Sequence, residues 1–276
     1  MMAEYPGTAT EAFIMTGSNP FDPEHLDRLE RDCMVAPLLV GDIQANGISG
    51  RDAKVNIHLV SASKGQLRVW EMPERHASVK RRYIVVVDVG GRANTSDYSV
   101  IAVMSMRQAK QPAVVVAQWR GHIDHDRLAW KAMQLAKFYN DALLVIESNT
   151  LTNEAARAGE SEYILRELHT VYGPIYKRES GQLGFHTNVK TKRMAVTALI
   201  AALRDGSYVE RDLDAVNEMR DYEERKGCYA ARPGKHDDIL MTRAIGLCVM
   251  DDKRVRVGEN PVKKDFSMDN GISTAV

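Results

Sequence analysis

The chain has 276 residues, 44% hydrophobic and 27% charged, which is the composition of an ordinary globular protein. Lysine plus arginine and aspartate plus glutamate each number 37, so the formal net charge is zero and neither indicates nor excludes a polyanionic partner. The three cysteines form no CxxC pair, and we find no signal peptide and no apolar run of about 18 residues; these features argue against a disulfide framework, a zinc site, secretion and a membrane span.

The first third of the chain does not look like a domain of its own. Residues 1–34 are polar and rich in turns, with a short helix expected over 23–31. Residues 35–80 are expected to form a linker in which 55–60 and 67–70 alternate apolar with polar residues. A Lys-Gly turn between these two runs predicts a small β-hairpin with one packed face.

The main domain is expected over residues 81–250 and begins with closely spaced strands. Three short-linked strands, at 83–89, 98–106 and 113–119, predict an antiparallel meander. A helix over 126–139 and a fully apolar, hence central, strand at 142–146 follow.

The rest of this domain is predicted to be mainly helical. We expect helices over 152–168, 191–204, 212–224 and 237–250, short strands at 208–209 and 229–231, and a disordered tail over 251–276. The fold class is therefore α/β: a mixed sheet with helices on both faces, in an order compatible with the ribonuclease-H-like fold.

Acidic residues stand where apolar runs end or a helix begins. Asp88 ends the run 83–87, Glu147 ends the run 142–146, and Asp237 and Asp238 precede an apolar helix. A carboxylate at the end of a buried strand is costly to desolvate unless something compensates its charge. Divalent cations that prefer oxygen ligands provide that compensation.

Each of these residues also has a plainer interpretation. Asp88 can simply start a Gly-containing turn, although Asp97 lies across that turn and adds a second carboxylate to the same cleft. One of Asp237 and Asp238 can be only a helix cap. Glu147 is explained by neither, which favours a functional interpretation, and His236 is read as a neighbouring polar group rather than a ligand.

The carboxylates together suit two-metal hydrolysis of a phosphodiester. Two Mg²⁺ or Mn²⁺ ions about 3.5–4 Å apart activate a water and stabilise the leaving oxygen, and Asp88 on a central strand suits the bridging position. Candidate DNA-binding residues flank the site: Lys177, Arg178, His186, Asn188, Lys190, Lys192 and Arg193. The chain has neither a GxxxxGK[ST] loop nor a GxSxG motif, so we expect no P-loop ATPase and no serine hydrolase here.

At this point the sequence resembles a known family, the C-terminal nuclease domain of the large terminase subunit of tailed bacteriophages. The resemblance covers about residues 83–250. It rests on 87–91 with 96–100, on 144–150, on 184–188 with 191–192, and on 236–240. In addition, residues 4–13 resemble the segment that closes the ATPase domain of these proteins, so the chain looks like the back half of a terminase.

The resemblance implies a metal-dependent endonuclease that cleaves double-stranded concatemeric viral DNA during genome packaging. It implies metal ligation by Asp88, Glu147 and one of Asp237 and Asp238, with Asp238 favoured, and an accessory role for Asp97. It further implies the portal protein and the small terminase subunit as partners. The chain is then expected to be a monomer in isolation and part of a ring on the portal, in the host cytoplasm.

Three other functions stay open from the sequence. A RuvC-like junction resolvase would share the carboxylates but prefer branched DNA. An actin-like nucleotide-binding module would explain Asp88 and Gly90 but requires a second phosphate loop, which we do not find. A non-catalytic docking domain for the portal or small subunit would leave Glu147 unexplained.

Overall fold

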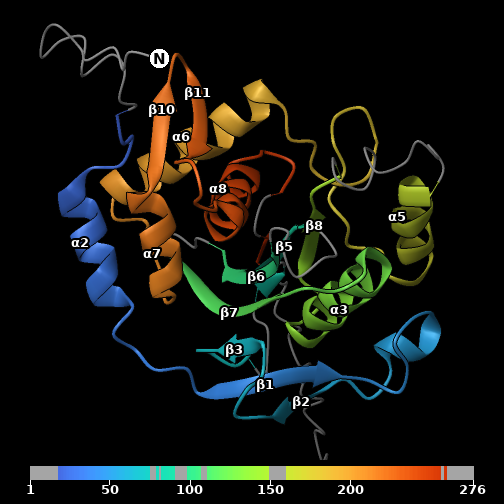
Figure 1. The fold of residues 1–276 in the computed structure, drawn as a ribbon. Coiled ribbons are helices and arrows are strands. Elements are labelled where there is room, and N and C mark those ends of the chain that lie inside the picture. The colour runs from blue at the N-terminus through green and yellow to red at the C-terminus, as the bar shows by residue number, and fades with distance from the viewer. Residues whose placement is uncertain are drawn as a thin grey trace, which may run out of the picture.

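The molecule is organised around one long mixed sheet (Figure 1). A computed structural model describes residues 18–74, 79–80, 82–90, 98–106, 111–148, 160–255 and 258–259. Within them the strand order is β2-β1-β3-β7-β6-β5-β8, with β9 beside β7. The strands are β1 (Leu39–Gln44), β2 (His58–Ser61), β3 (Leu67–Val69), β5 (Tyr83–Asp88), β6 (Ser99–Ser105), β7 (Ala113–Gly121), β8 (Leu143–Ile146) and β9 (Tyr208–Val209).

The meander is confirmed, but the strand expected to be central over 142–146 is wrong in its position, because β8 lies at the end of the strand order. Strands β5, β6 and β7 pair antiparallel in sequence order, and β8 pairs parallel to β5 on the other side. This is the ribonuclease-H-like arrangement expected from the sequence. Every residue of β6 and β8 is buried, which explains why these strands are apolar on both faces.

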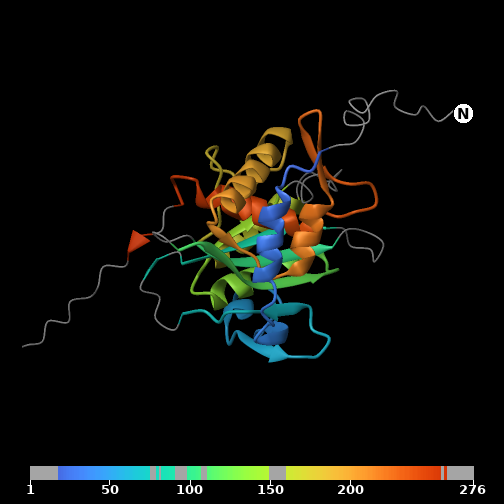
Figure 2. The ribbon, with the colours of Figure 1, turned by 90° about the vertical axis from the view of Figure 1, so that its left-hand side faces the viewer.

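Helices cover both faces of the sheet, as expected. Val85 and Val87 belong to the core under α3 (His125–Phe138) and α5 (Glu160–Val171), whereas Ile84 and Val86 belong to the core under the other helices. That second layer consists of α2 (Pro23–Asp32), α6 (Val189–Arg204), α7 (Leu213–Arg220) and α8 (Asp238–Met250). Two views at right angles place α2 beside α7, and the helices make contact (Figure 2).

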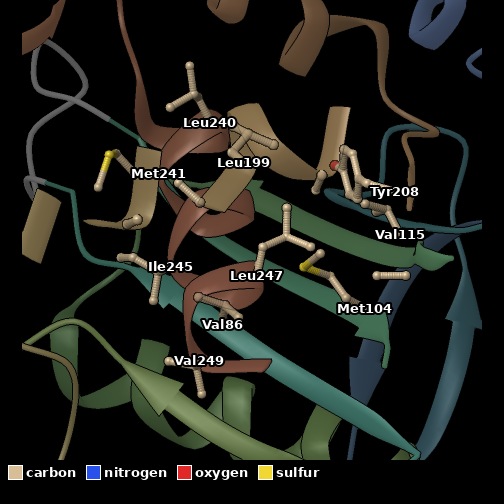
Figure 3. Packing of buried hydrophobic residues seen from close by; sticks show 14 of the residues in the cluster. Val86, Met104, Val115, Leu199, Tyr208, Leu240, Met241, Ile245, Leu247 and Val249 are labelled. Atoms are coloured by element: carbon tan, nitrogen blue, oxygen red, sulfur yellow. The ribbon is translucent and has the colours of Figure 1, made fainter. Parts of the chain in front are cut away.

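Helix α8 lies directly on the sheet. It is apolar around most of its circumference because it is buried between the sheet and the outer helices. At Gly246 a Cβ atom would come within 2.8 Å of Met104 Sδ and 3.1 Å of Val86 Cγ2, so only glycine allows this approach without a shift of the core. Figure 3 shows Ile245 and Leu247 of α8 among these sheet residues. This close approach holds the second half of α8 against β5 and β6.

The expected hairpin in the linker is wrong. Strands β2 and β3 do not pair with each other, because β1 lies between them and pairs antiparallel with both. Strand β3 then pairs with β7, which joins this segment to the main sheet. The sequence pattern showed alternating faces but did not show which strand is the neighbour.

The helix expected over 212–224 ends at Arg220. Its last residues form β10 (Tyr222–Arg225), which pairs antiparallel with β11 (Cys228–Ala231). The turn between them holds Lys226 at φ +51° and Gly227 at φ +79°, the conformation of a tight two-residue hairpin. The Lys226-Gly227 pair thus indicates a hairpin, but the helical periodicity before it led to the prediction of a helix up to residue 224.

The C-terminal segment has more structure than expected. Val255 is buried, and β12 (Gly258–Glu259) pairs antiparallel with β4 (Val79–Lys80), within a tail expected to be disordered from residue 251. The part of the helix expected over 152–159 lies outside the described residues, as do residues 1–17 with the segment 4–13. None of the described helices is both long and apolar enough to cross a bilayer.

The cysteines give a first test of this packing. Burial, and then the charges of Glu210 and Asp212, raise the pKa of the Cys33 thiol to about 12. Burial and the charges of Asp251 and Asp252 raise the pKa of Cys248 to about 11. Cys228, by contrast, is exposed in the β10–β11 hairpin.

A thiol-reactive probe at about pH 8 should therefore label Cys228 first, because the thiolate is the reactive form. We expect Cys33 and Cys248 to react at least about 100-fold more slowly than Cys228, because both are shielded by packing and their thiolate populations are about 100- to 1000-fold smaller than that of a thiol of ordinary pKa. Stopped-flow labelling of wild type and of Cys228→Ser measures this. A fast phase that survives in Cys228→Ser would show that the packing around Cys33 or Cys248 is wrong.

Candidate active site

Two of the expected acidic residues meet at one edge of the sheet. Val87 of β5 is the parallel partner of Ile146 of β8, so Asp88 and Glu147 follow side by side at the carboxyl ends of these strands. The Glu147 backbone N–H donates to Val87 O at 3.0 Å, which fixes this register one residue further. Both residues keep partial solvent exposure, so the edge is accessible from outside.

Asp237 and Asp238 enter the same edge from the start of α8. Asp238 is buried, and its Oδ2 accepts a hydrogen bond from the Tyr98 backbone N–H at 3.2 Å. Asp237 is in the N-cap position, yet its side chain makes no capping hydrogen bond and instead meets Lys192 Nζ at 2.9 Å. Capping alone therefore does not account for Asp237.

Electrostatic interactions link these residues to Asp88. Burial raises the pKa of Asp88 well above its ordinary value; a side-chain hydrogen bond with Glu147 and the negative charges of Glu147, Asp238 and Asp237 raise it further. Neighbouring carboxylates that raise the pKa of Asp88 in this way carry negative charge that the surrounding protein does not fully compensate. Such a site favours a bound cation or a shared proton.

The donor set fits a hard divalent cation in its chemistry. All four side chains offer carboxylate oxygens, the ligands that Mg²⁺ and Mn²⁺ prefer. Within the described parts of the chain, however, no three His, Cys, Asp or Glu side chains are arranged as a formed metal site. Asp97, the fifth expected ligand, lies outside the described residues.

A glycine loop supports Glu147. Phe185 pairs with Glu147 in a parallel bridge, its N–H donates to Ile146 O at 2.8 Å, and its carbonyl accepts from the Ser148 N–H and hydroxyl. Gly184 precedes it at φ +81°, where a Cβ atom would lie 2.7 Å from Ile146 O. The loop expected along the DNA path therefore also holds the strand end that carries Glu147.

We expect Gly184→Ala to lower the free energy of unfolding by about 3 kcal/mol and to reduce any activity that depends on Glu147, because it adds a clash to a strained φ. Gly181→Ala is the matched control: its φ is +82°, but nothing lies within 4 Å of its added Cβ. The control should cost only about 1 kcal/mol. Urea unfolding followed by circular dichroism measures both; equal losses would contradict the proposed clash.

The expected basic residues are brought together only in part. Lys192 reaches the carboxylate cluster through Asp237. Asn188 caps α6 by accepting from the Thr191 N–H at 3.0 Å, and the Thr191 hydroxyl donates to His186 O, so this segment is shaped by capping. Lys177, Lys190 and Arg193 are exposed and Arg178 is half-buried; no contact with nucleic acid tests their role.

The chain matches no family model and no curated protein in sequence. Its structure is similar to the large terminase nuclease of thermophilic phage G20c, at 17% identity and a TM-score of 0.46 over 78% of this chain and 95% of that one. It is also similar to the P22 large terminase nuclease domain, at 13% identity and a TM-score of 0.44 over 65% of this chain and 86% of that one.

A viral nuclease outside the phages is also similar. The human cytomegalovirus terminase nuclease domain has 10% identity and a TM-score of 0.41, over 66% of this chain and 89% of that one. The structural neighbours are thus terminase nuclease domains from phages and a herpesvirus. At these identities and TM-scores the likeness assigns no activity to this chain.

One residue of the site was missed from the sequence. Glu218 of α7 is buried, and its Oε2 accepts the Leu240 N–H at 2.9 Å, so a neighbouring helix supplies the acidic cap that Asp237 does not. Burial, and then the charge of Asp238, raise the pKa of Glu218 to about 8 against the effect of the hydrogen bond. Helical periodicity alone gave no signal that this glutamate turns toward α8.

Proposed function

We propose that this chain is the nuclease part of a terminase large subunit, a divalent-metal-dependent endonuclease that hydrolyses phosphodiesters of double-stranded DNA. The observation that carries the proposal is the convergence of Asp88, Glu147 and Asp238 from two strand ends and a helix start. A purely structural role does not explain this convergence, because clustered carboxylates repel one another. This repulsion helps to raise the pKa of Asp88.

The residues divide the work as follows. Asp88, at the end of β5, interacts with both Glu147 and Asp238, so these three carboxylates would hold the cations together. Asp88, Glu147 and Asp238 would hold the divalent cations, which would supply activation of a water and stabilisation of negative charge on the phosphodiester. Lys192 neutralises Asp237, which leaves Asp238 as the α8 carboxylate that we propose as a ligand.

The biological setting is part of the same proposal. The substrate would be concatemeric viral DNA, cut when packaging starts and ends. The partners would be the portal protein and the small terminase subunit, in the host cytoplasm. The exposed Lys190 and Arg193 on the first turns of α6, two and five residues along from the capping Asn188, are suited to contact DNA phosphates.

A RuvC-like resolvase is the second candidate, because the carboxylate cluster alone does not distinguish the two nucleases. The same cleavage assay separates them by substrate. A resolvase should cut a four-way junction much faster than a linear duplex, whereas the proposed enzyme should cut both at similar rates.

Plasmid digestion tests the proposal directly. We expect the chain to nick and linearise supercoiled DNA with Mg²⁺ or Mn²⁺ and to lose this activity in EDTA, because catalysis requires the cations. Asp88→Asn should lose the activity. Asp205→Asn is its matched control, since Asp205 is an exposed carboxylate paired with Arg204 at 2.8 Å, away from the cluster. Absence of cleavage of supercoiled, linear and branched DNA with every metal would favour the docking-domain alternative.

A further inference from the structure

A polar groove leads away from the carboxylate cluster and has no role in the chemistry described so far. It consists of two adjoining cavities of about 270 and 170 Å³ that share Arg120 and Asp214 in their walls. The larger cavity is also lined by Gly65, Gln66, Arg68, Tyr98 and Gln118, and the smaller by Asn217, Glu218, Asp221, Lys235 and His236. The groove thus reaches the residue directly before Asp237.

An aromatic platform forms part of the larger cavity. Tyr98 is 38% exposed, stacks on His122 with the ring centroids 4.3 Å apart, and has the Arg120 guanidinium 4.5 Å from its ring centroid. The backbone N–H of the same residue binds Asp238. A ligand on this platform therefore lies next to the proposed catalytic carboxylates.

Charge balance indicates what kind of group the groove takes. Arg120 meets Asp214 at 3.5 Å and Glu218 at 3.9 Å, Arg68 meets Asp212 at 3.2 Å, and Lys235 meets Asp221 at 2.9 Å. Each cation thus already has a carboxylate partner, which weakens its attraction for a phosphate. A flat, neutral, polar-edged group suits the platform better than an anion.

Unused hydrogen-bonding atoms point to the same kind of group. Gln118 is 2% exposed, and among the described residues its Oε1 has no hydrogen-bond partner, nor does Arg120 Nε. Both side chains line the larger cavity. They can serve the donor and acceptor edge of a heterocycle that stacks on Tyr98.

We propose that the Tyr98 cavity binds an unpaired nucleobase of the DNA strand that passes the carboxylate cluster. The inference rests on the proposed nuclease function and extends it, because it implies that the enzyme takes a locally single-stranded or frayed strand beside the scissile phosphate. The volume suits one base, being below the roughly 300 Å³ from which pockets for drug-sized ligands begin.

Binding in EDTA tests the proposal independently of cleavage. The probes are a 2-aminopurine-labelled single-stranded oligonucleotide and a blunt duplex of the same sequence, measured by fluorescence quenching and anisotropy. We expect the single strand to be quenched by the wild type, and its Kd to rise about 5- to 100-fold in Tyr98→Ala, the range given by loss of one base–aromatic stack. The Kd of the blunt duplex should change less than about twofold, because its bases are paired.

Two control variants test whether a change in affinity comes from the aromatic ring of Tyr98. Tyr98→Phe keeps the ring and should recover most of the affinity. Ile48→Ala truncates a side chain that is 67% exposed outside the groove and should bind like the wild type. Thermal melting confirms that each variant folds, and the Tyr98 backbone N–H to Asp238 is preserved in all of them.

The outcomes separate the two proposals. Wild-type affinity in Tyr98→Ala, or no quenching by the wild type, while plasmid cleavage still requires metal and Asp88, would overturn the base pocket and leave the nuclease intact. Absence of metal-dependent cleavage by the wild type would instead overturn the nuclease, and with it the reason to expect a DNA strand in this groove.

Discussion

Asp88→Asn should abolish metal-dependent cleavage and at the same time stabilise the metal-free protein. Loss of a residue that binds the cations directly should lower the cleavage rate by more than the roughly 100-fold that follows loss of a residue that only supports such a ligand. Stability moves the other way because burial and the neighbouring carboxylates Glu147, Asp238 and Asp237 raise the pKa of Asp88, and asparagine removes that repulsion.

The sign of the pH dependence follows from the raised pKa. Above the ordinary aspartate pKa the folded Asp88 keeps a proton that the unfolded chain has lost, so the folded state binds more protons there. Stability of the metal-free wild type therefore falls as pH rises through this window, and asparagine has no proton to lose. The difference in melting temperature between variant and wild type should grow in EDTA as pH rises above the ordinary aspartate pKa.

Manganese gives the complementary measurement. Mn²⁺ should raise the melting temperature of the wild type, because a ligand that binds the folded state stabilises it, and should have little effect on Asp88→Asn. Asp205→Asn, at the exposed Arg204 pair, controls for the loss of a charge and should behave like the wild type. A variant that is less stable than the wild type at all pH values would be incompatible with the clustered carboxylates described here.

Arg243→Met should lower the free energy of unfolding by about 3–5 kcal/mol, the usual cost of leaving one charge of a buried ion pair alone. Arg243 and Glu210 are both fully buried, with Arg243 Nε 3.0 Å and Nη2 3.1 Å from the Glu210 carboxylate. The charge of Arg243 and the hydrogen bonds from Arg243 and Tyr208 lower the pKa of Glu210 against its burial, so Glu210 stays ionised and would lose its main partner.

Urea unfolding measures this loss, with two comparisons built into the chain. Arg204→Ala removes an arginine that is 66% exposed and paired with Asp205, and should destabilise the protein far less than Arg243→Met does. The double variant with Glu210→Met should recover a large part of the loss, because no buried charge remains. A loss in Arg243→Met no larger than that of Arg204→Ala would count against the buried pair. Since Arg243 belongs to α8, cleavage should fall along with stability.

Much of the central fold and of the candidate site could be predicted because local patterns carry that information. Fully apolar runs identified the buried strands that end at Asp88 and Glu147, and short connections identified the meander. Parallel neighbours end at the same edge, so two strand-end carboxylates imply a shared site. The start of α8 at Asp238 followed from an apolar stretch preceded by acidic residues.

Tertiary structure decided what depends on neighbours far apart in the sequence. Pairing of β1 with both β2 and β3 replaced the expected hairpin, since alternation marks a buried face but not a partner. The Lys192–Asp237 pair and the Glu218 cap together leave Asp238 as the α8 carboxylate that is not occupied by an ion pair with Lys192.

The sequence by itself thus determined which residues are acidic at strand and helix ends, because apolar periodicity is a local property. Only the tertiary structure decided which of those carboxylates form ion pairs with basic side chains, which cap a helix and which interact with one another. The platform of Tyr98, His122 and Arg120 beside them also depends on contacts between residues far apart in the sequence. Ion pairs, stacking and desolvation act through space, and the distances that govern them are set by the packing of α7 and α8 on the sheet.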